Sequence, residues 1–97
     1  MNKIITILEA RVSEQKWDTL QNAYRAIKEN QSPPMPLQSF LVQMKEKPTL
    51  WRIITIWESM EVLQKMKNSG ETPAGVLVFR QADAEPTLSI FETKEEI

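Results

Sequence analysis

The 97-residue chain contains no cysteine and no histidine, and it has only two glycines. The absence of cysteine excludes disulfides, thiolate nucleophiles, zinc–thiolate sites and iron–sulfur clusters. The absence of histidine removes the usual general base, the catalytic triads that use it and histidine ligands for haem or zinc. Gly70 and Gly75 form no phosphate-binding loop. A metal site would need carboxylates alone, so we expect neither a metal nor a cofactor.

The chain also lacks an excess of either charge and any long apolar run. Its 12 basic and 13 acidic residues give a net charge of -1, which favours neither nucleic acid nor anionic membranes as partners. The apolar run within residues 1–9 is too short for a signal peptide, and no stretch could span a bilayer. We therefore expect a cytoplasmic protein with a single domain over residues 1–97.

Apolar periodicity predicts a strand followed by a helix in the first third of the chain. Residues 4–12 are rich in β-branched side chains, which is typical of a strand. Ser13 then suits a helix cap, and an apolar stripe at spacings of three and four predicts an amphipathic helix over residues 13–30. Residues 31–36 hold three prolines and cannot continue this helix.

Two strands and a second helix are predicted next. Residues 37–45 alternate between apolar and polar, and residues 50–58 give the strongest strand signal in the chain. Ser59 suits the cap of a helix that ends at Gly70. The inner face of that helix would consist of Met60, Leu63 and Met66 or Lys67. Alternation over residues 87–93 predicts the last strand.

Residues 72–84 allow two interpretations. Thr72 as a cap and Pro73 at the first helical position indicate a helix. The run Val76-Leu77-Val78-Phe79, taken alone, indicates a strand. We favour a short helix because the capping residues precede the apolar run.

The resulting element order predicts an α+β fold, the ferredoxin-like sandwich. It has four strands in an antiparallel or mixed sheet, with helices on one face, and we expect the central strands to be parallel. The two strands with the clearest signals carry apolar side chains on both faces, so a monomer would leave an apolar sheet face in water. Packing of two sheets face to face would remove this patch. We therefore predict a homodimer through the sheet faces.

Residues 53–59, Ile-Ile-Thr-Ile-Trp-Glu-Ser, followed by Met60-Glu61-Val62-Leu63, resemble the strand–Trp-Glu–helix segment of the antibiotic biosynthesis monooxygenase-like family. The strand at residues 4–12 that runs into a serine-capped helix is similar to that family's opening. The resemblance implies a dimeric α+β barrel. Family members include cofactor-free quinone-forming monooxygenases, haem-degrading enzymes and proteins without an assigned activity.

The haem-degrading branch depends on a histidine ligand with a tryptophan nearby. This chain has no histidine and carries Met66 about where that branch places its tryptophan, which argues against haem degradation. The cofactor-free monooxygenases use Asn, Trp, Tyr and Arg to orient a polycyclic phenol and to stabilise its anion. The comparable residues here are Trp57, Tyr24, Arg52, Arg80 and Asn22. An arginine beside a developing phenolate would stabilise it by a charge-assisted hydrogen bond.

Structural roles compete with these assignments. Tyr24 lies on the apolar stripe of the first helix and Trp57 ends a core strand, so both could serve packing. Arg52 and Glu58 share a strand face and could pair across the sheet with Glu9 and Arg11. Arg80 lies in the segment whose structure is ambiguous.

Two functions from different classes remain open. The chain could be a cofactor-independent monooxygenase that acts on a small aromatic or apolar metabolite. It could instead be a non-catalytic dimeric barrel that binds a small hydrophobic ligand or acts as an accessory protein. In either case we expect the cavity between the helices and the sheet, bordered by Trp57, Tyr24 and residues 72–84, with the proline-rich loop as a lid.

Overall fold

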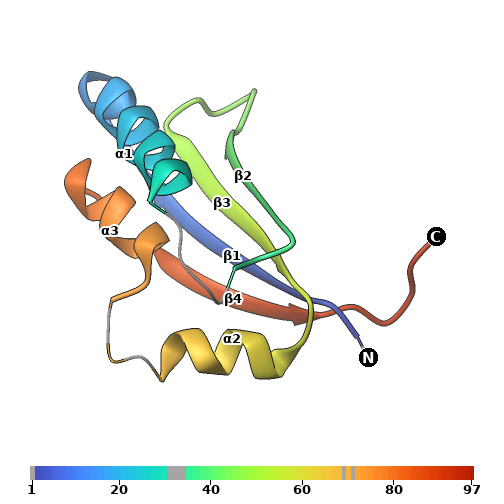
Figure 1. The fold of residues 1–97 in the computed structure, drawn as a ribbon. Coiled ribbons are helices and arrows are strands. Elements are labelled where there is room, and N and C mark those ends of the chain that lie inside the picture. Colours follow the sequence, from blue (N-terminus) through green and yellow to red (C-terminus); the bar gives the residue numbers. More distant parts are fainter. Residues whose placement is uncertain (1, 31–34, 69, 71) are drawn as a thin grey trace.

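In the described part of the chain, a four-stranded sheet is covered on one face by three α-helices (Figure 1). The computed structural model describes residues 2–30, 35–68, 70 and 72–97. Most of the proline-rich segment predicted to be a lid, residues 31–34, lies outside the described residues. None of the described helices is long and apolar enough to cross a membrane.

The sheet has the strand order β2-β3-β1-β4. Its central strands are β1 (Ile4–Arg11) and β3 (Leu50–Trp57), flanked by β2 (Gln38–Gln43) and β4 (Thr87–Glu92). Every neighbouring pair is antiparallel. The expectation of parallel central strands is therefore wrong. Because β3 is antiparallel to both β1 and β2, these two strands run the same way, with β3 between them in the opposite direction.

The helix after β1 begins later than predicted. A 3₁₀ turn over Glu14–Lys16 comes first, and α1 spans Trp17–Glu29. Ser13 makes no side-chain cap; its carbonyl oxygen instead accepts the Lys16 N–H at 2.8 Å. This tighter turn lets the Trp17 indole N–H donate back to the Val12 carbonyl oxygen at 2.9 Å.

The second helix, α2 (Met60–Lys67), is capped as predicted, because the Ser59 hydroxyl accepts the Val62 N–H. It stops before Gly70, which has a φ of 79° in the left-handed region. Its inward-facing residue is the buried Leu63, flanked by the half-buried Val62 and Met66. Met60, predicted on this inner face, is 39% exposed.

Residues 72–84 form the predicted short helix. The helix α3 spans Ala74–Gln81, with Pro73 rather than Thr72 in the cap position. Pro73 serves there because its carbonyl oxygen accepts the N–H groups of Val76 and Leu77. Asp83, with a φ of 58°, then turns the chain toward β4.

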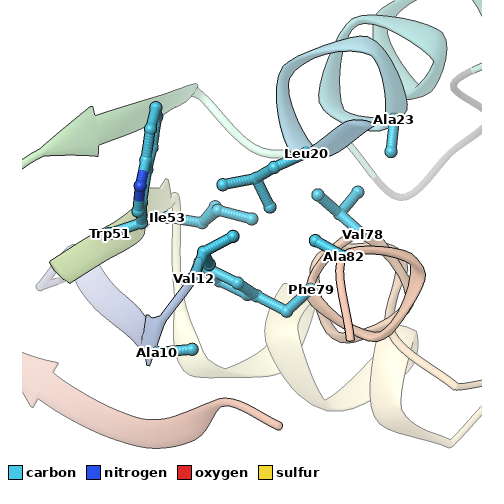
Figure 2. Packing of buried hydrophobic residues seen from close by; sticks show 9 residues of the cluster. All are labelled: Ala10, Val12, Leu20, Ala23, Trp51, Ile53, Val78, Phe79 and Ala82. Atoms are coloured by element: carbon cyan, nitrogen blue, oxygen red, sulfur yellow. The ribbon is translucent and has the colours of Figure 1, made fainter. Parts of the chain in front are cut away.

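The main hydrophobic core lies between α1, α3 and one end of the sheet (Figure 2). Leu20 of α1 and Phe79 of α3 are fully buried there against strand residues. The Trp17 and Trp51 rings meet edge to face with their centroids 6.0 Å apart. A smaller cluster of Ile4, Trp57 and Leu63 lies under α2. The gap between these two clusters positions the cavity described below.

The face of the sheet away from the helices is open (Figure 1). Strand register and alternation place a mainly apolar set on it. Its members include Ile5, Ile7, Ile54, Ile56, Phe40, Val42 and Phe91. Among them Phe40 and Phe91 are 45% and 51% exposed. Arg52 and Glu9 also lie on this face, and the Arg52 Nε–Glu9 Oε1 distance of 2.6 Å confirms the predicted cross-strand pair.

Candidate functional site

A cavity of about 850 Å³, partly open to solvent, lies between the helix-side face of the sheet and the three helices. Its size falls in the range that holds a drug-sized molecule. Side chains of the inward-facing strand positions form its floor, and α1, α2 and α3 contribute the walls. Its surface is mainly apolar, and the residues that line it include Thr6, Leu8, Tyr24, Ser39, Ile53, Thr55, Trp57, Leu63, Gly75 and Val78.

A row of hydroxyl groups crosses the floor of this cavity. Thr6 on β1 is the register partner of Thr55 on β3, and Thr55 is in turn the partner of Ser39 on β2. All three side chains point to the helix side because they alternate with the residues of the open face. An otherwise apolar cavity with a few aligned polar groups can orient a ligand through its oxygen atoms.

Two hydrogen-bonded groups make up this row. The Tyr24 hydroxyl on α1 donates to the Ser39 hydroxyl at 2.7 Å, and the Ser39 and Thr55 oxygens lie 3.3 Å apart. The Trp57 indole N–H donates to the Thr6 hydroxyl oxygen at 3.0 Å. Tyr24 and Trp57, both on the helix side of the sheet, thus fix the floor hydroxyls.

Charge is scarce around the cavity. Among the described residues that line it, Lys67 at the end of α2 is the only one that carries a charge, and it is exposed. The described lining includes no carboxylate. Within the described part of the chain, no group of three acidic residues could hold a metal ion. The cavity as described suits an apolar molecule with oxygen substituents better than an ion.

Two of the five predicted site residues line this cavity. Trp57 is buried at the end of β3 and Tyr24 is half-buried on α1. Both also pack against a hydrophobic cluster. Their roles in packing and in the cavity wall are therefore compatible, since one edge of each ring contacts the core and the other bears a polar atom.

The other three predicted residues lie elsewhere. Arg52 points to the open sheet face, because it alternates with Trp51 and Ile53. Arg80 is exposed on α3 and pairs with Glu85, whose Oε1 lies 2.9 Å from its Nη2. That hydrogen bond raises the pKa of Arg80 and lowers the pKa of Glu85. Asn22 is exposed on α1, where its side-chain oxygen accepts a hydrogen bond from Arg25.

The floor hydroxyls Thr6, Ser39 and Thr55 were not predicted as site residues. Their signal in the sequence is a small hydroxyl side chain at an inward position of an otherwise apolar strand. A buried hydroxyl needs a partner, so such a position indicates a polar site within the core.

The chain is similar to known proteins in its three-dimensional structure, whereas the sequence comparisons find no match. No protein-family model and no curated protein matches the sequence. Solved structures match over nearly the whole chain. A conserved protein from Methanosarcina mazei superimposes with a TM-score of 0.74 at 17% identity, covering 97% of this chain and 95% of that one.

Two further neighbours are described as oxygenases. A "putative antibiotic biosynthesis monooxygenase" from Caulobacter crescentus gives a TM-score of 0.70 at 17% identity, covering 97% and 92% of the two chains. SnoaB, a cofactor-independent oxygenase from Streptomyces nogalater, gives 0.68 at 10% identity, covering 100% and 98%. The likeness extends over whole chains at low identity, so the common feature is the fold. The chain has the ferredoxin-like α+β fold of the antibiotic biosynthesis monooxygenase-like proteins.

Proposed function

We propose that this protein is a cofactor-independent monooxygenase that acts on a small aromatic or otherwise apolar metabolite. The observation that carries the proposal is the cavity of about 850 Å³, mainly apolar, with hydroxyl groups aligned across its floor. Structural neighbours that include a cofactor-independent oxygenase support the reaction class.

The chemistry needs no resident redox group if the substrate itself is the reductant. A methylene carbon next to an aromatic ketone or phenol loses a proton and gives an electron-rich anion. Dioxygen adds to that carbon, and the product is a ketone plus water: the methylene group loses two hydrogens and gains one oxygen atom. The second oxygen atom leaves in the water. Floor hydroxyls can stabilise the anion on the substrate oxygen, and the apolar walls can exclude bulk water.

Oxygen consumption tests this proposal directly. We expect the purified protein to accelerate oxygen uptake by anthrone above the blank without protein, with one dioxygen consumed for each anthraquinone formed. Thr55→Val, in the cavity floor, should slow the reaction by about tenfold or more. Thr87→Val, on β4 outside the cavity, should leave it unchanged. An uptake rate equal to the blank would contradict the proposal.

The alternative is a non-catalytic protein that binds a small hydrophobic ligand. One observation favours it: the described cavity lining offers neither a carboxylate nor a histidine as a general base. Ligand binding without accelerated oxygen uptake would select this alternative.

We also propose that the protein is a homodimer joined through the open sheet faces. The apolar side chains on that face support it, with Phe40 and Phe91 among the exposed ones, since soluble monomers rarely expose large contiguous apolar patches. The chain exposes 6855 Å², whereas a compact monomer of its mass would expose about 5,700 Å². The interface should bury more than about 1,000 Å² in total.

A further inference from the structure

Thr6 lies in the cavity floor on β1, one of the two central strands. Its neighbours across the sheet are Thr55 on β3 and Ile90 on β4. Its side chain is buried, with 8% exposed, and it lines the cavity. A ligand atom held by Thr6 would therefore lie over a central strand of the sheet, on the side that the helices cover.

Trp57 determines how Thr6 can form hydrogen bonds. An indole N–H can only donate, so at 3.0 Å the Thr6 oxygen must be its acceptor. The hydroxyl proton of Thr6 is then directed elsewhere. Among the described residues, no hydrogen-bond acceptor for that proton is found. A buried donor of this kind gains from any acceptor that a ligand brings into the cavity.

Tyr24 donates to the Ser39 oxygen, and the Ser39 and Thr55 hydroxyls share one further hydrogen bond in which either can be the donor. That pair therefore also keeps one hydroxyl proton without an acceptor among the described residues, on Thr55 if Ser39 donates and on Ser39 if Thr55 donates. Thr6 differs because its arrangement is fixed: the Trp57 N–H occupies one lone pair of its oxygen, and the Thr6 proton is left for an acceptor on a ligand.

We propose that Thr6 anchors an acceptor oxygen of the ligand, the carbonyl oxygen of a neutral fused-ring ketone, and that Trp57 acts as its positioning residue. Leu8 and Ile53 beside it offer an apolar surface for the rings. A neutral ligand fits because Lys67, the charged residue of the described lining, is exposed at the end of α2. The inference rests on the proposed function in that both place the ligand in this cavity.

The test compares two ligands of nearly the same shape, 9-fluorenone and fluorene, of which only the first has an acceptor oxygen. Equilibrium dialysis gives the Kd of each, and the ratio of the two constants cancels differences in hydrophobicity between protein variants. In Thr6→Val, which keeps the volume of the side chain, we expect the selectivity for the ketone to fall about three- to tenfold. The Kd for fluorene should stay the same. Thr6→Ser should retain the selectivity of the wild type.

Trp57→Phe tests the positioning role, since it should reduce the ketone selectivity while the hydrocarbon still binds. Thr87→Val, a strand threonine outside the cavity, is the matched control and should change neither constant. The proposal is overturned if Thr6→Val keeps the selectivity of the wild type, or if neither ligand binds.

Oxygen-uptake measurements separate this inference from the proposed function. Ketone selectivity that depends on Thr6, without accelerated oxygen uptake, would refute the monooxygenase and leave the anchor in place. Accelerated oxygen uptake, together with a ketone selectivity that Thr6→Val does not change, would refute the Thr6 anchor and leave the monooxygenase in place.

Discussion

Gly75 on α3 lies directly against Leu8 on β1. A Cβ atom added at Gly75 would approach Leu8 Cδ1 to 2.7 Å and Ile53 Cδ1 to 3.6 Å. Both Gly75 and Leu8 line the cavity. The absence of a side chain at position 75 therefore lets α3 approach the sheet closely while Leu8 keeps its place in the floor.

Gly75→Ala should weaken ligand binding while changing the stability of the fold very little. Alanine gains up to about 1 kcal/mol of helix propensity over glycine, while Leu8, a flexible side chain, must move toward the cavity. We expect a nearly unchanged melting temperature and a roughly threefold or greater loss of affinity for fluorenone in dialysis. Gly70→Ala is the opposite control: its φ of 79° with nothing nearby predicts a loss of about 1–2 kcal/mol with unchanged affinity.

Leu20→Ala should destabilise the fold by about 2–5 kcal/mol. Leu20 is fully buried between α1, α3 and the sheet, so its removal leaves a void in the main core. Leu77→Ala, at a position that is 45% exposed, should cost less than about 1 kcal/mol. Urea denaturation measures both. Equal losses for the two variants would mean that the main core does not lie under α1.

Ile54→Lys should convert the proposed dimer into a monomer. Ile54 lies on the open face at the centre of the sheet, paired with Ile7 and Phe40, and a charge buried there without a partner is costly. Sedimentation velocity at micromolar concentration should show a dimer for the wild type and a monomer for the variant. Met60→Lys, on α2 away from this face, should stay dimeric. A monomeric wild type would rule out the sheet-face dimer.

Trp57 should report ligand binding by fluorescence. It is the tryptophan among the described cavity-lining residues, whereas Trp17 and Trp51 pack in the main core. Addition of 4-cyclohexylphenol, with excitation selective for tryptophan, should change the emission. Trp57→Phe should abolish most of that change and Trp17→Phe should preserve it. The converse pattern would move the site to the main core.

The Arg80–Glu85 pair predicts a pH dependence at the surface. The hydrogen bond from Arg80 lowers the pKa of Glu85, so the pair contributes stability above the ordinary Glu pKa. This contribution is lost as the pH falls through the lowered pKa of the folded state. In an NMR titration, Arg80→Gln should return the Glu85 pKa toward its ordinary value. Glu92, whose pKa Lys94 lowers, should titrate as before.

The strands and the helix faces could be predicted because the spacing of apolar side chains along the sequence follows the pattern of burial. Alternation along β1 and β3 divided their residues into two apolar faces without showing which one the helices cover; in the structure the face with Trp51, Ile53 and Trp57 is the buried one. The relative direction of two paired strands could not be predicted in this way, since parallel and antiparallel pairs have the same side-chain alternation. Helix ends were also misplaced, because Ser13 uses its carbonyl group instead of its side chain.

The candidate site was only partly predictable for a different reason. Trp57 and Tyr24 were named because they match residue types that the cofactor-free monooxygenases use, and this matching of types also named three residues outside the cavity. Thr6 and Thr55 are ordinary strand residues, and only the register of distant strands aligns them. Arg52 could have been excluded from the cavity on sequence grounds, since it alternates with Trp51 and Ile53.

The central position of β1 also affects how the protein is made. β1 leaves the ribosome before both of its partners, β3 and β4, and β4 follows all the other described elements. Pairing of Thr6 with Ile90 closes almost the whole sequence into one loop, and such distant pairings slow folding. During synthesis the backbone hydrogen-bonding groups on both edges of β1 stay unpaired until β3 and β4 have been made. In that time this strand, which carries Ile5 and Ile7, can pair with strands of other unfolded chains. The strand that carries the Thr6 hydroxyl of the cavity is therefore the segment on which chaperone protection would matter most.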